Sequence, residues 1–267
     1  MLSIVSNISK YWAPINEISD KLQKYCIQNK YNRIVEIGPG MIQFPLASEF
    51  IGYSESIPNY INIDIDDTNL PYKDKEVEFI YCRHTMEDLL NPVFAIKEMI
   101  RCCKSGYIET PSPLVEITKD VDGNRYGYQK SYSGYIHHHF IIWSNIQKCE
   151  IYLLPKITPI LDHFLTIYNK DNYHQLLKNN YLWNNYFIWK DKEPSVILYK
   201  HFDKMNNKTY VENYIDLIDK EKLCSLGLIK NANTKVKLIG GSGAFNPSFK
   251  VKVELYSQSA KSFSQES

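Results

Sequence analysis

The sequence has no imbalance of charge and no long apolar run, and each absence excludes a class of protein. Its 31 basic and 30 acidic side chains give a net charge of +1, so we expect no overall attraction to nucleic acid or to an anionic membrane. No window approaches the length of a membrane span, and no basic segment followed by an apolar run stands at the N-terminus. These features predict a soluble protein with no membrane partner.

The sequence also lacks regular cysteine spacing. Disulfide frameworks and cysteine-based zinc sites use regular spacings such as C-x-x-C, and no such pair is present. We therefore expect reduced structural thiols and a cytoplasmic location. The six cysteines are Cys26, Cys82, Cys102, Cys103, Cys149 and Cys224.

The stretch Arg33–Gly40 predicts a short buried strand that ends in a tight turn. Three apolar residues and Glu36 lead directly into Gly-Pro-Gly. Glycines at such a turn let the backbone come close to a ligand. We expect a helix to follow through Phe44–Phe50, with its N–H groups pointing into the same crevice. A carboxylate at Glu36 would repel a phosphate, so the loop suits a ligand with a cationic end.

This loop resembles the first motif of class I S-adenosylmethionine-dependent methyltransferases, and residues 31–113 keep step with their compact type 11 branch. The resemblance implies a Rossmann-like three-layer α/β sandwich, shortened after its second strand, with S-adenosylmethionine as the cofactor. The third glycine of the rival dinucleotide fingerprint would fall at Gln43, which disfavours a nicotinamide enzyme. The cofactor contacts implied at the loop are Glu36, Gly38, Pro39 and Gly40.

The resemblance implies a second strand over Tyr60–Ile65. Asp64 then falls where these enzymes hold the two ribose hydroxyls, and an ionised carboxylate is well suited to accept both hydrogen bonds. Asp66 and Asp67 are competing candidates. Ile65 and Leu70 are expected to contribute to the adenosine pocket, the latter within a Leu-Pro-Tyr segment.

Val77–His84 matches the fourth strand of the family, and its end, with Cys82 and Arg83, is expected to face the methionine portion of the cofactor. Asn91 and Pro92 predict the start of a helix that runs to Arg101. A fifth strand is expected over Tyr107–Ser112. Where relatives continue Leu-Glu-His, this chain has Met86-Glu87-Asp88, so one histidine of the family pattern is absent.

We expect residues 114–150 to form a substrate-facing insertion. Within it, Tyr135–Trp143 predicts a strand, on which His137 and His139 share one face and His138 points away. These histidines could bind substrate, act as a base or be structural. Two same-face histidines also suit zinc, but the sequence identifies no further ligand, so no metal is assigned.

The family pattern ends with an expected antiparallel hairpin of Leu182–Trp189 and Ser195–His201. We therefore predict a methyltransferase domain over residues 1–202 and a helical and β-hairpin extension with a disordered tail over 203–267. The repeat of apolar residues over Ile15–Tyr25 predicts a first helix, with Asn16 or Ser19 as its cap. Trp12, just before this helix, could fold over the cofactor, but a role in packing the helix against the sheet is the better explanation for this residue.

The predicted reaction is O-methylation of a sugar or another small hydroxylated metabolite, such as a nucleotide-sugar used in polysaccharide synthesis. A hydroxyl acceptor loses its proton, and a neutral histidine is the usual base. The catalytic candidates are His84, His137 and His139; Glu109 could be a base or a structural carboxylate. The alternatives are a nucleic-acid or protein methyltransferase and an inactive interaction module. The oligomeric state is not predicted.

Overall fold

The computed structural model describes residues 14–52, 58–116, 121–122, 132–146, 148–159 and 183–199. The chain divides into two compact units, and the first, which contains every element discussed below, comprises Met1–Pro113, His137–Lys156 and Trp183–Tyr199. Trp12 and the predicted extension over 203–267 lie outside the described residues. Among the described residues, no helix is long and apolar enough to cross a membrane.

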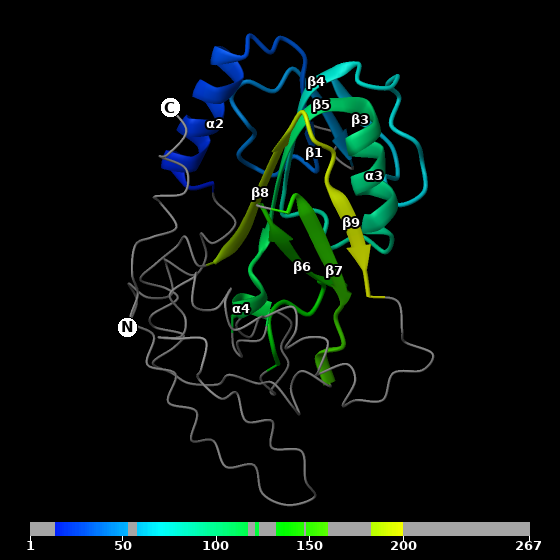
Figure 1. Cartoon of the computed structure of the whole chain (residues 1–267). Coiled ribbons are helices and arrows are strands. Elements are labelled where there is room, and N and C mark those ends of the chain that lie inside the picture. Colours follow the sequence, from blue (N-terminus) through cyan, green and yellow to red (C-terminus); the bar gives the residue numbers. More distant parts are fainter. Residues whose placement is uncertain are drawn as a thin grey trace, which may run out of the picture. The chain divides into compact units, whose positions relative to one another are not determined.

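A six-stranded sheet forms the centre of the first unit (Figure 1). In spatial order its strands are β3 (Tyr60–Asn62), β2 (Glu49–Gly52), β1 (Ile34–Ile37), β4 (Val77–Arg83), β5 (Cys103–Pro111) and β8 (Asn184–Lys190). The first five are parallel to their neighbours, and β8 pairs with β5 in the antiparallel sense. This order confirms the predicted Rossmann-like α/β class.

Helices α2 (Asn16–Gln28) and α3 (Pro92–Cys102) cover opposite faces of this sheet (Figure 1). Because strand side chains alternate between faces, Ile34 packs in a cluster with Leu22 of α2. The next residue, Val35, packs with Ile96 of α3. The two apolar clusters make the three layers that the sequence predicts.

A second sheet, made of three strands, lies on the α3 face. Its strands are β6 (Phe140–Asn145), β7 (Glu150–Pro155) and β9 (Ser195–Leu198). Leu153 of β7 belongs to the same core cluster as α3. The predicted hairpin of β8 with β9 is therefore wrong in its pairing, because β8 pairs with β5 and β9 pairs with β7 in parallel.

The structure confirms the predicted elements that have strong local signals. Strands β4 and β5 lie where expected, and α3 begins at Pro92 with the side chain of Asn91 accepting a hydrogen bond from the Phe94 N–H at 3.4 Å. The first helix is also present, but its predicted cap is wrong. Ile15 stands at the N-cap without a side-chain hydrogen bond.

The region after β1 differs from the prediction. Residues 44–50 form no helix, and Glu49–Gly52 is instead strand β2, paired directly with β1. Tyr60–Asn62, predicted as the second strand, is therefore the third, on the far side of β2. A four-residue strand beside a loop gives too little periodic signal to distinguish it from helix in the sequence.

Five of the six cysteines lie in the described residues, and none of these five is in a disulfide. Burial raises the pKa of the Cys26 and Cys103 thiols to about 12. It raises the pKa of Cys102 to about 11. These thiols stay protonated at neutral pH and belong to the apolar core.

Candidate functional site

The strand order identifies the crevice where a ligand would bind. Strands β2 and β3 extend the sheet from β1 in one direction, whereas β4 and β5 extend it in the other. In open α/β sheets, ligands bind outside the carboxyl ends of the strands at this switch point. The residues at those two ends are Gly38, after β1, and Arg83 and His84, at the end of β4.

The glycine loop closes tightly at Gly38 and is open at Gly40. Gly38 has a φ of +65°, and a Cβ atom there would lie 2.0 Å from Thr85 Oγ1. Its N–H donates to the Ile51 carbonyl at 2.8 Å. A Cβ atom on Gly40 would meet no atom within 4 Å beyond those of Gly40 and its two chain neighbours. Gly38 is thus required by the fold, whereas Gly40 leaves room for another molecule.

Glu36, in β1, binds the backbone of the loop that follows this strand. Its side chain is buried, and Oε2 accepts a hydrogen bond from the Phe44 N–H at 2.8 Å. Burial raises the pKa of Glu36 to about 7, and the Phe44 hydrogen bond and the Arg83 guanidinium only partly oppose this rise. The carboxyl group is therefore poised to ionise near neutral pH, and a cation in the crevice would favour its charged form.

His84 lies between two buried carboxylates at the end of β4. Its Nδ1 is 3.3 Å from Glu87 Oε1, and its Nε2 is 3.7 Å from Glu109 Oε1. The backbone of His84 has a φ of +50° and donates its N–H to the Glu109 carbonyl at 2.9 Å. Such left-handed backbone at a non-glycine residue is uncommon and concentrates at functional sites.

Glu109 has the contacts of a structural carboxylate. It is 2% exposed, and it accepts hydrogen bonds from the Tyr107 hydroxyl at 2.7 Å and from Asn184 Nδ2 at 2.6 Å. Arg83 Nη1 lies 3.9 Å away. Because its oxygens are already engaged, Glu109 is better suited to orient His84 and Arg83 than to remove a proton itself.

The aspartates after β3 have different partners. Asp66 accepts hydrogen bonds from the N–H groups of Asn91 and Leu90 at 2.7 and 3.2 Å, which ties it to the start of α3. Asp64 is exposed and accepts a bond from the Asp66 N–H at 3.0 Å. Asp67 accepts from the hydroxyl of Thr68 at 2.9 Å. Asp66 is therefore structural, whereas Asp64 stays a candidate.

Three expected cofactor residues have side chains in the apolar core on the α3 face: Ile65, Leu70 and Cys82. Leu70 is held by its backbone as well, since its N–H donates to Glu98 Oε2 at 3.0 Å and its carbonyl accepts from Arg101 Nη2 at 3.2 Å. Any contact of these residues with a ligand would come from the backbone.

The predicted pairing of His137 with His139 is wrong. Strand β6 begins only at Phe140, so the alternation of a strand does not extend to these histidines. Instead, the rings of His137 and His138 meet edge to face with centroids 4.4 Å apart. His139 is exposed. Glu87 and Asn184 were not predicted as site residues. The position of Glu87, three residues after His84, is the sequence signal that points to it.

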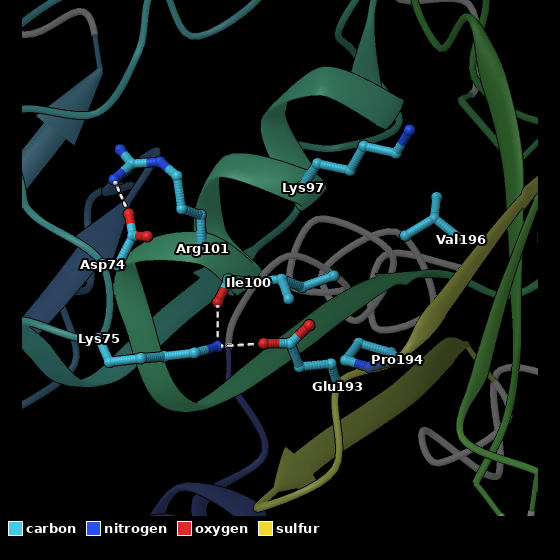
Figure 2. A pocket seen from close by; sticks show the side chains of 8 residues that line it. All are labelled: Asp74, Lys75, Lys97, Ile100, Arg101, Glu193, Pro194 and Val196. Atoms are coloured by element: carbon cyan, nitrogen blue, oxygen red, sulfur yellow. Dashed lines mark hydrogen bonds and ion pairs between the residues drawn. The ribbon is translucent and has the colours of Figure 1, made fainter.

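A separate cavity of about 360 Å³ lies against α3 (Figure 2). It is at the other end of the sheet from the crevice, since Lys75 precedes β4 and Arg101 lies in the last turn of α3. Lys75 Nζ lies 2.6 Å from Glu193 Oε1 and donates to the Ile100 carbonyl at 2.7 Å. Figure 2 shows these groups pointing toward each other, so they satisfy one another rather than awaiting a ligand.

A family model described as a methyltransferase domain matches residues 20–108, from α2 into β5, which confirms the resemblance seen in the sequence. No curated protein matches the chain.

Solved structures of S-adenosylmethionine-dependent methyltransferases are also similar. One from Clostridium acetobutylicum has 10% identity and a TM-score of 0.33, covering 79% of this chain and 80% of its own. One from Mesorhizobium loti has 16% identity and a TM-score of 0.26, covering 32% and 50%. One from Thermotoga maritima, a possible histamine N-methyltransferase, has 19% identity and a TM-score of 0.28, covering 41% and 64%. The chain spans about half the length of the first solved structures that it matches.

The two loop glycines predict opposite effects on folding. Gly38→Ala should lower the free energy of unfolding by roughly 2 kcal/mol or more, because it adds a clash with Thr85 to an unfavourable φ. Gly40→Ala, the matched control, should change it by less than about 0.5 kcal/mol. Urea unfolding measures both. Equal destabilisation by the two substitutions would contradict the described loop.

The pKa of Glu36 predicts a pH-dependent stability. Between its ordinary value of 4.5 and about 7, the folded state keeps a proton that the unfolded state has lost, so the stabilisation present below pH 4.5 falls as the pH rises to 7. Glu36→Gln cannot ionise and still accepts from Phe44. Its stability relative to the wild type should rise across this window by up to roughly 3 kcal/mol, at 1.36 kcal/mol per pKa unit. Parallel stability curves from pH 4 to 8 would refute the shifted pKa.

Proposed function

We propose that this chain, whose residues 20–108 match a methyltransferase domain, methylates a hydroxyl group of a sugar or another small hydroxylated metabolite. S-adenosylmethionine supplies the methyl group on a sulfonium, which is already a strong electrophile. The protein then has to align donor and acceptor and to receive the hydroxyl proton. The observation that carries the proposal is the joint presence of an open Gly40, a poised Glu36 and an oriented His84 at one sheet crevice.

The residues at the crevice fit this cofactor. The backbone at Gly40 is open on the side where a Cβ atom would stand, and Glu36 offers a negative charge that a cationic ligand would stabilise. We assign the methionine end of the cofactor to Glu36, Gly38–Gly40 and Arg83. Asp64, beyond the end of β3, is exposed and able to accept hydrogen bonds from the ribose hydroxyls.

His84 is the proposed base. The neighbouring carboxylate of Glu87 or Glu109 can hold one ring nitrogen as the N–H donor, and the other nitrogen then carries the lone pair that accepts the hydroxyl proton. With the cofactor bound, the acceptor oxygen would receive the methyl group, and His84 would take up the proton that this oxygen loses. His137 and His139 are the second candidates for contacts to the acceptor.

The acceptor class rests on two properties of the chain. Its net charge of +1 gives no general attraction to nucleic acid. Its resemblance to methyltransferases of polysaccharide synthesis favours a sugar or nucleotide-sugar as the acceptor. As for location, its free, protonated thiols favour a cytoplasmic protein. We retain residues 1–202 as the proposed catalytic domain, with 114–150 facing the substrate and 203–267 as an extension.

Cofactor binding tests the crevice directly. Calorimetric titration with S-adenosylmethionine should show one site per chain. Gly40→Ala should weaken it roughly tenfold or more, about 1.4 kcal/mol, without changing stability. Asp64→Ala should weaken it similarly, whereas Asp67→Ala is the matched control and should not. Absence of binding to the folded wild type would refute the proposal, and binding without turnover on any acceptor would favour an interaction module.

The role of His84 is tested by turnover. With a nucleotide-sugar acceptor identified by release of S-adenosylhomocysteine, His84→Gln should lower kcat about 100-fold or more and leave cofactor affinity unchanged. The loss should be smallest at high pH, where the acceptor loses its proton more readily. Unchanged kcat would exclude His84 as the base, and turnover on RNA at moderate salt in preference to nucleotide-sugars would contradict the acceptor class.

A further inference from the structure

Two histidines and an aspartate from separate segments meet beside the crevice. Asp88 lies in the turn after β4, and His137 and His138 lie just before β6. Asp88 Oδ1 is 3.7 Å from His137 Nε2 and 3.8 Å from His138 Nε2. One potential ligand atom from each of the three residues lies within 4.8 Å of the other two.

The backbone holds these side chains together without help from a ligand. The Glu87 carbonyl accepts hydrogen bonds from the N–H groups of His139 at 2.7 Å and Phe140 at 3.2 Å, and so clamps the two segments to each other. The Asp88 N–H donates to the Thr85 carbonyl at 3.1 Å, which closes the turn. His138 is only 4% exposed, so its ring is fixed by its surroundings. Such prior ordering is what a tight metal site requires.

The donor set selects a class of ion. Two imidazoles and one carboxylate are typical ligands of zinc and related divalent transition metals, whereas magnesium and calcium prefer oxygen ligands alone. Bonds of about 2.0–2.1 Å in a tetrahedral site put ligand atoms roughly 3.3 Å apart. The observed distances of 3.7 and 3.8 Å from Asp88 are close to that spacing, and all three ligand atoms lie within 4.8 Å of one another, so small rotations of the side chains would complete the site.

We propose that Asp88, His137 and His138 bind one divalent transition-metal ion, with zinc as the best match. Three protein ligands leave a fourth position for water or for a hydroxyl group of a bound molecule. The rim of the site is accessible, since the side chains of Asp88 and His137 are 41% and 36% exposed. This proposal concerns ion binding and does not rest on the proposed methyl transfer.

Metal uptake by the untagged full chain tests the site. Zinc titrated in competition with a chromophoric chelator should bind at about one equivalent per chain, and cobalt should give the intense visible absorption of a four-coordinate ion. Asp88→Asn and His138→Gln should each weaken zinc roughly tenfold or more. His139→Gln, which alters an exposed histidine in the same segment, is the matched control and should bind zinc like the wild type.

Zinc should also raise the Tm of the wild type and of His139→Gln, and at the same zinc concentration it should raise the Tm of Asp88→Asn less, because stabilisation by a ligand falls as its affinity falls. If the variants fail to fold, the cobalt spectrum and stoichiometry of the wild type still decide. Substoichiometric uptake, a spectrum of six-coordinate cobalt, or equal loss of zinc in the His139 control would overturn the proposal and leave an ion pair between histidine and aspartate.

Discussion

The buried carboxyl group of Glu36 is the constraint on which the crevice depends. By accepting the Phe44 N–H, it bends the loop over the end of β1, and this bend brings Gly38 against Thr85 and exposes Gly40. Burial makes ionisation costly near neutral pH. Ionisation of this buried carboxyl group lowers the stability of the fold, and a cationic ligand bound nearby would offset that loss. Carboxylates with such shifted pKa values concentrate at functional sites.

The second half of the crevice depends on a network that joins two parts of the chain far apart in sequence. His84 is at the end of β4, whereas Asn184, which holds Glu109 beneath it, begins β8. The antiparallel pairing of β8 with β5 brings these residues together. Strand β8 therefore both closes the sheet and fixes the carboxylate that faces His84 and Arg83.

The elements whose sequence signals are local and strong were predicted correctly. Strand β4 is an apolar run interrupted only by Glu78 before it ends at Arg83, and the Asn91–Pro92 cap defines the start of α3. The glycine turn and the end of β4 are predicted correctly as neighbours because parallel strands present their carboxyl ends at one edge. The fold class was predicted from the resemblance of these segments, in their order along the chain, to the methyltransferase family.

The features that were not predicted from the sequence are those that depend on tertiary contacts. Strand β2 has four residues and is recognised only through its pairing with β1, so its omission shifted Tyr60–Asn62 from third to second place. His137 and His138 meet because a turn precedes β6, and alternation along a strand cannot anticipate a turn. Asp88 became relevant only once its distance to both rings was known.

The central claim is that the crevice between the ends of β1 and β4 binds S-adenosylmethionine. Amide chemical shifts of the ¹⁵N-labelled full chain, followed during titration with this compound, test it most directly. The largest changes are predicted at Gly38, Gly40 and His84. Changes confined to the cavity beside Lys97, or none at saturating cofactor, would contradict the claim.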